Sequence, residues 1–90
     1  MKIEKETIEQ IVNFGVFEYK PEKMASILGF TKQEIEAEMK NKESEFYKFF
    51  QKGKDMADYV IDLKLFEMAK TGDIKALEKL DSRKRLRLIG

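Results

Sequence analysis

Residues 21–42, PEKMASILGFTKQEIEAEMKNK, predict two short helices joined by a tight turn. Pro21 suits the first position of a helix, because the N–H that it lacks would have no partner there. Gly29 follows the last apolar residue of the first helix and favours the left-handed conformation that commonly ends helices. Thr31 and Glu34 have the spacing of a capping box, so the second helix should begin directly after the turn.

The short turn between these two helices is typical of a helix-turn-helix. Ala25 is small enough for two helix backbones to approach, and Phe30 and Ile35 would fill the corner between them. The same arrangement also occurs as a corner between helices that binds no nucleic acid. The turn therefore leaves both interpretations open.

A helical wheel of the second helix places Ile35 and Met39 inward, with the carboxylates of Glu34, Glu36 and Glu38 on the flanks of the opposite side. The candidate DNA-contacting residues here are Thr31, Lys32, Gln33, Ala37, Lys40 and Asn41. Gln and Asn can pair with adenine, and Ala can contact the thymine methyl group. Because the flanking carboxylates repel phosphates, we expect this helix alone to bind DNA weakly.

The strongest positive charge lies near the end of the chain. Residues 73–90 hold six basic and three acidic side chains, whereas residues 31–45 hold three Lys and five Glu. The candidate phosphate-contacting residues in the basic stretch are Arg83, Lys84, Arg85 and Arg87. Such clusters contact phosphates. Basic residues also favour the C-terminal ends of helices, so a solvated helix end is the alternative.

The composition predicts an all-α cytosolic protein without catalytic function. The 90 residues include a single Pro and neither Cys nor His, which removes thiolate chemistry and the commonest general base and metal ligand. Asp55, Asp58 and Asp62 form an acidic row without a further ligand, so we expect a solvated face and no metal or other cofactor. No signal peptide is recognisable, and no apolar run approaches the roughly 18 residues of a membrane span.

A further helix is predicted before this turn. It should run from about Lys5 to Phe14 and end at Gly15, and residues 16–19 should form an extended connector. Together with the two short helices it would make a DNA-binding unit over residues 1–43.

Residues 44–90 should form a helical hairpin with a basic tail. Ser44 can cap a long helix that stops at Gly72, and Gly53 marks either a bend or a close helix crossing within it. Asp73 can cap a final helix. The residues of that helix expected to face the long helix are Ile74, Leu77 and Leu80.

The apolar residues of the long helix keep to one stripe as far as Val60 and then spread around the circumference. A helix that is apolar on all sides must be buried on all sides, and this short chain offers little to cover it. We therefore predict a homo-oligomer. The alternative is a monomer in which the N-terminal unit folds over the helix. The candidate interface residues are Phe49, Phe50, Met56, Val60, Ile61, Leu65, Phe66 and Met68.

Three segments, KMASILGFTKQEI, EFYKFFQKGKDMADYVI and LFEMAKTGDIKAL, occur in an order that resembles the small subunits of phage terminases, the DNA-packaging motors of tailed bacteriophages. The resemblance covers about residues 7–85, although Glu78, Lys79 and Asp81 stand where many relatives have apolar or aromatic residues. It implies a non-catalytic, ring-forming protein whose helix-turn-helix units bind double-stranded viral DNA for packaging. It also implies a separate large subunit as partner, and a bacterial host or prophage context.

Two other functions fit the residues. The acidity of residues 31–45 would suit a protein-interaction module that docks a basic partner. A dimeric helix-turn-helix transcription regulator would contain the same corner. The mass of the assembly distinguishes the regulator from the terminase-like protein, because the regulator would be a dimer and the terminase-like protein a larger ring.

Overall fold

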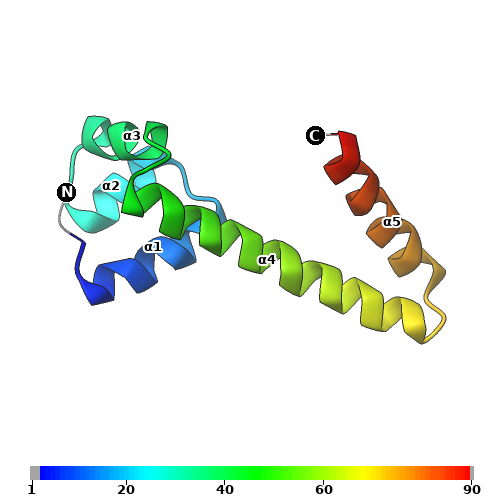
Figure 1. Ribbon diagram of the computed structural model, residues 1–90. Coiled ribbons are helices and arrows are strands. Elements are labelled where there is room, and N and C mark those ends of the chain that lie inside the picture. The colour runs from blue at the N-terminus through cyan, green and yellow to red at the C-terminus, as the bar shows by residue number, and fades with distance from the viewer. Residues whose placement is uncertain (1–2, 90) are drawn as a thin grey trace. The chain divides into compact units, whose positions relative to one another are not determined.

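The computed structural model describes residues 3–89, and all regular secondary structure within them is helical. The helices are α1 (Lys5–Phe17), α2 (Pro21–Leu28), α3 (Lys32–Lys40), α4 (Glu45–Lys70) and α5 (Ile74–Ile89) (Figure 1). The predicted all-α class is therefore confirmed. In this described part of the chain, no helix combines the length and the apolar character that crossing a membrane requires.

The chain divides into two compact units, Met1–Ala57 and Asp58–Gly90. The first unit contains α1, α2, α3 and the first part of α4, and the second contains the rest of α4 with α5. This division falls within α4, later than the break after residue 43 that the sequence suggested, because the first turns of α4 carry part of the core of the first unit.

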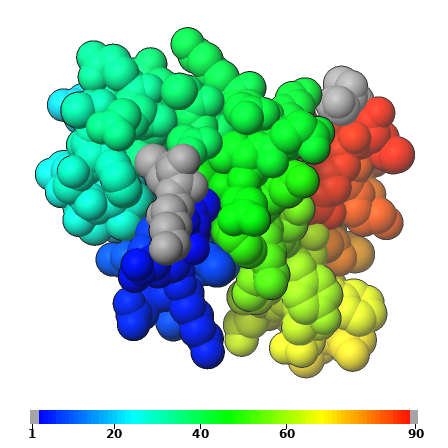
Figure 2. All heavy atoms as spheres, turned by 60° about the vertical axis from the view of Figure 1, so that its left-hand side comes forward, coloured from blue at the N-terminus to red at the C-terminus, as the bar shows by residue number. Residues whose placement is uncertain are grey.

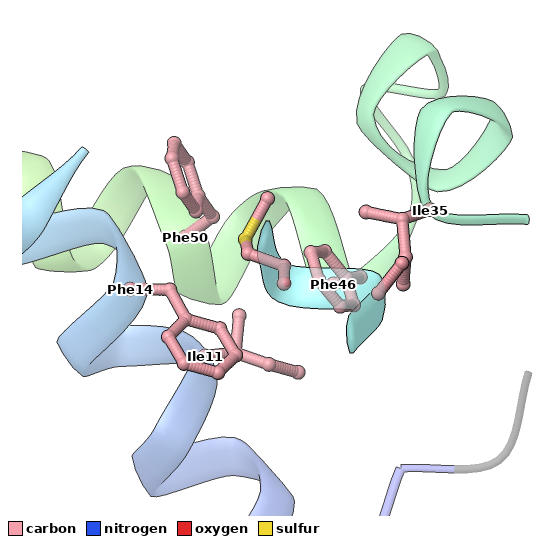
Figure 3. Close-up of a cluster of buried hydrophobic side chains, with 7 residues drawn as sticks. Ile11, Phe14, Ile35, Phe46 and Phe50 are labelled. Atoms are coloured by element: carbon pink, nitrogen blue, oxygen red, sulfur yellow. The ribbon is translucent and has the colours of Figure 1, made fainter. Parts of the chain in front are cut away.

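The core of the first unit is a cluster of buried side chains from four helices. Its members are Ile11, Phe14, Met24, Ala25, Ile35, Phe46 and Phe50. Figure 3 draws this cluster as sticks, and its labelled members come from α1, α3 and α4. Two predicted interface residues lie here instead: Phe50 is a core member, and Phe49 is partly buried against the cluster. Both pack within the first unit because α1 crosses α4 at this point.

The crossing of α1 and α4 depends on two glycines. A Cβ atom on Gly15 would lie 2.0 Å from the carbonyl oxygen of Phe50, and one on Gly53 would lie 1.9 Å from the carbonyl oxygen of Val12. Such distances are far below van der Waals contact, so only glycine lets these backbones approach so closely. Of the two roles that the sequence left open for Gly53, the close crossing is confirmed.

The predicted end of the first helix at Gly15 is wrong. Helix α1 continues through this residue to Phe17, so residues 16 and 17 are helical and do not form an extended connector. The helix ends at Glu18, whose φ of 57° lies in the left-handed region and whose backbone N–H donates to the carbonyl oxygen of Gly15 at 3.2 Å. At Gly15 the absence of a side chain allows α1 to cross α4 closely, and the residue does not end the helix.

The other predicted helix ends are confirmed by their caps. Gly29 closes α2 with a φ of 79°. The Ser44 hydroxyl accepts a hydrogen bond from the backbone N–H of Phe46 at 3.1 Å, and the Asp73 carboxylate accepts one from the N–H of Ala76 at 3.0 Å. Side chains that accept from the first turn in this way satisfy donors that the helix itself cannot pair.

Candidate nucleic-acid interface

Helix α3 packs against α2 through Ile35, which is fully buried. The predicted capping box is present at its N-terminus: the Thr31 hydroxyl accepts from the N–H of Glu34 at 3.2 Å, and the Glu34 carboxylate accepts from the N–H of Thr31 at 3.0 Å. In the space-filling view the atoms of α2 and α3, cyan to blue-green, form one continuous surface (Figure 2). The side of α3 opposite Ile35 belongs to the exposed surface.

All of the candidate DNA-contacting residues of α3 and its two ends are exposed. They are Thr31, Lys32, Gln33, Ala37, Lys40 and Asn41. Gln33, Ala37 and Lys40 have the i, i+4, i+7 spacing that places side chains on one helix face. We call these three residues the reading face.

Two of the candidates outside the reading face have polar groups that are already engaged. The Lys32 ammonium lies 3.7 Å from a carboxylate oxygen of Glu36, one turn further along. The Asn41 carboxamide oxygen accepts a hydrogen bond from the backbone N–H of Glu43 at 3.0 Å. This hydrogen bond fixes the orientation of the Asn41 carboxamide and uses one of the two lone pairs of its oxygen, whereas no such contact holds the carboxamide of Gln33 among the hydrogen bonds of the described residues.

The three carboxylates of α3 each have a local partner. Glu34 belongs to the capping box, and Glu36 pairs with Lys32. A carboxylate oxygen of Glu38 accepts a hydrogen bond from the hydroxyl of Ser44 at 2.7 Å. These contacts hold the carboxylates beside the reading face and partly offset their charge. The three carboxylates therefore repel an approaching phosphate less than free carboxylates would.

In the second unit, the arginines that the sequence assigned to phosphate contact pair with the acidic row. Arg83 Nε donates to Asp62 Oδ1 at 2.7 Å, and Arg83 Nη2 donates to Asp58 Oδ1 at 3.2 Å. Arg87 donates to the other carboxylate oxygen of Asp62. The expectation that this acidic row is solvated is wrong for Asp62, whose side chain is 22% exposed, whereas Asp58 remains 57% exposed beside Arg83.

The electrostatics of this cluster favour the charged forms. Burial by itself would raise the pKa of Asp62, but the hydrogen bonds from Arg83 and Arg87 outweigh it and lower the pKa below its ordinary value. The hydrogen bond to Asp62 likewise raises the pKa of Arg83. We call these four residues, Asp58, Asp62, Arg83 and Arg87, the ionic cluster.

The remaining basic candidates point away from the ionic cluster. Arg85 lies 2.9 Å from Asp81 on the same helix, and its side chain is 75% exposed. Lys84 is also exposed. The structure thus separates the predicted basic stretch into two arginines held against α4 and two residues directed to solvent.

The face of α5 that meets α4 agrees with the prediction at Leu80 and differs from it at Ile74 and Leu77. Ile74 and Leu77 were expected there, but they are 70% and 55% exposed. Ala76 is buried, and Leu80 and Arg83 are half-buried. The ion pairs lie on this face, and the matching four-residue spacing of the two aspartates and the two arginines was the sequence signal that could have revealed it.

The second unit has almost no apolar core. Among its described residues only Ala76 is buried. An open groove of about 810 Å³ separates the two helices, with Ile61 and Leu65 of α4 and Arg83 of α5 among its lining. Most of the interface candidates, including Met56 in the first unit, are exposed, whereas Leu65 is half-buried. The exposed large apolar residues of the second unit are Tyr59, Val60, Ile61, Leu63, Phe66, Met68, Ile74, Leu77, Leu86 and Leu88.

No protein-family model, curated protein or solved structure matches this chain. The resemblance to terminase small subunits thus stays a prediction. Within the described residues, no group of His, Cys, Asp or Glu side chains is arranged to hold a metal ion.

Proposed function

We propose that this chain is a non-catalytic DNA-binding protein that acts as a homo-oligomer, as the resemblance to terminase small subunits implies. In this proposal α2 and α3 form a helix-turn-helix, and α3 enters the major groove. The observation that supports it best is the exposed reading face on a helix whose carboxylates all have local partners.

The reading face carries the chemistry that a groove requires. Gln33 offers a donor and an acceptor to the edge of adenine, Ala37 can contact a thymine methyl group, and Lys40 can reach a phosphate. One copy of α3 makes few such contacts, so its affinity should be low. Several copies held in one assembly bind more tightly, because each further contact forms at a high effective concentration.

The exposed apolar residues of the second unit support the oligomeric part of the proposal. On α4, Tyr59, Leu63 and Phe66 recur with a helical spacing, and we call them the outer stripe. Each large apolar side chain that is covered removes on the order of 100 Å² from water. A stable interface needs about 800 Å² per partner, which the outer stripe and the exposed apolar residues of α5 could supply together.

The DNA-binding role is tested by a double substitution on the reading face. Gln33→Glu with Lys40→Glu should weaken binding to a double-stranded DNA at least tenfold at about 50 mM salt, because it places carboxylates against phosphates. The control is Lys5→Glu with Gln10→Glu, which makes the same chemical changes at exposed positions of α1. Fluorescence anisotropy with a labelled duplex measures both affinities.

Two results would count against this role. Equal weakening by the two double variants would mean that α3 contributes only to the net charge. No binding by the unaltered chain at about 50 mM salt, where electrostatic attraction is strong, would overturn the DNA-binding proposal and favour a protein-docking role for the same face.

Self-association is tested by the mass in solution. We expect the unaltered chain to exceed its monomer mass of 10.6 kDa in light scattering, and Leu63→Glu with Phe66→Glu to return it to that mass. Phe17→Glu with Ile27→Glu is the control, because these apolar side chains are 60% and 48% exposed but belong to the first unit and are not interface candidates. A monomeric unaltered chain would contradict the proposal, and a stable dimer would favour the transcription regulator over a ring.

A further inference from the structure

We propose that Arg83 and Arg87 form a phosphate-binding site that Asp58 and Asp62 mask in the unbound chain. This inference rests on the proposed function, since DNA is the source of the phosphates. It assigns to the ionic cluster an autoinhibitory contact, in which carboxylates occupy the place that the phosphates of the nucleic acid would take.

The geometry of the ionic cluster is that of an arginine site with its ligand bound. The guanidinium of Arg83 reaches two carboxylates, through Nε to Asp62 at 2.7 Å and through Nη2 to Asp58 at 3.2 Å. Asp62 uses one oxygen for Arg83 and the other for Arg87. Carboxylate and phosphate oxygens present similar acceptor pairs to the planar guanidinium, so the same two arginines can hold either group.

Stability alone does not account for charged residues at these positions. Half-exposed ion pairs contribute at most about 1 kcal/mol each, and apolar residues in their place often stabilise a fold more. Ile61 and Leu65 line the neighbouring groove, and apolar side chains beside them would help to close a unit in which, among the described residues, only Ala76 is buried. We therefore interpret the four charged side chains of the ionic cluster as a site for a ligand.

Displacement of the aspartates would begin at the contacts of Asp58 and Arg87, because Asp62 is only 22% exposed. The side chain of Asp58 is 57% exposed and that of Arg87 is 47% exposed, so water and salt screen their interactions. DNA presents one charge per roughly 1.7 Å of its axis, a density that two carboxylates cannot match. Lys84 and Arg85 lie next to the site in sequence and add exposed positive charge for the approach of the DNA.

The test compares two double variants of equal net charge. Asp58→Asn with Asp62→Asn should bind a duplex of random sequence about tenfold more tightly than Asp55→Asn with Glu67→Gln, which removes two carboxylates of α4 outside the ionic cluster. Each phosphate contact steepens the dependence of log K on log salt by about 0.9, so two unmasked arginines should steepen it by about 2. Anisotropy titrations at several salt concentrations measure both quantities.

A quadruple variant separates unmasking from disruption of the hairpin. Adding Arg83→Gln and Arg87→Gln to Asp58→Asn and Asp62→Asn restores the net charge of the unaltered chain, so the affinity and the salt slope should return to those of the unaltered chain. Equal slopes for the two double variants, or a quadruple variant that keeps the tighter binding, would overturn the masked site. If the unaltered chain binds no DNA, the proposed function fails; binding gained only by Asp58→Asn with Asp62→Asn would still support the masked site.

Discussion

Gly53→Ala should lower the free energy of unfolding by roughly 3 kcal/mol or more, a large part of the 5–15 kcal/mol that stabilises a typical domain. The added Cβ would lie 1.9 Å from the carbonyl oxygen of Val12. A backbone oxygen cannot move away by changing a rotamer, so α1 and α4 would have to separate and expose the core that they share. Urea denaturation followed by far-UV circular dichroism measures the loss.

Gly29→Ala is the matched control in the same unit. Gly29 has a φ of 79°, and no atom lies within 4 Å of the place where its Cβ would be. Its substitution therefore costs only the strain of a left-handed backbone, about 1 kcal/mol. If the two variants lost the same stability, the close crossing would not be what Gly53 provides.

The helix ends could be predicted from sequence where the chemistry is local. Thr31 and Glu34 cap α3 within three residues of one another, and Ser44 and Asp73 accept hydrogen bonds from the turns that follow them. Such caps depend on the spacing along the chain and on side-chain length, both of which the sequence contains. Gly29 belongs to the same class, because its left-handed conformation follows from its place after the last apolar residue of α2.

Features that depend on distant partners could not be derived in the same way. In the sequence, Gly15 looks like the end of a helix. Its role in the close crossing becomes visible only in the fold, where the backbone of Phe50 and Gly53 on α4 lies against it. The face that α5 turns to α4 could be predicted only in part, since Leu80 is half-buried as expected whereas Ile74 and Leu77 are exposed and Ala76 is buried. The face that contacts α4 carries Arg83, whose partners Asp62 and Asp58 lie 21 and 25 residues earlier in the chain.

In the candidate site, too, some features could be predicted from the sequence and others could not. The exposure of Gln33, Ala37 and Lys40 followed from the helical wheel, because one buried residue of a short helix determines its opposite side. The hydrogen bonds of Asn41 and Glu38 did not, since both depend on the conformation of the turn between α3 and α4. The wheel can therefore indicate which side chains face solvent, but not which of them keep their polar groups available.

Phe46→Ala should lower the free energy of unfolding by roughly 3–5 kcal/mol. Phe46 is fully buried in the core cluster, where it packs with residues of α1, α2 and α3, so its removal leaves a cavity that rigid helices cannot fill. Phe17→Ala deletes the same group at a side chain that is 60% exposed, and we expect it to cost about 1 kcal/mol. Denaturation midpoints of the two variants measure the difference.

The substitution Phe46→Ala should also affect the reading face of α3 and therefore the proposed DNA binding. Ile35 is the buried residue of α3, and it shares the core cluster with Phe46, so the packing that supports α3 weakens when the cluster loses its largest fully buried side chain. At a temperature where Phe46→Ala is partly unfolded, its DNA affinity should fall in proportion to the folded fraction, while Phe17→Ala keeps the affinity of the unaltered chain. Full DNA affinity in an unfolded Phe46→Ala variant would mean that binding resides in the charge of the chain and not in the fold that presents α3.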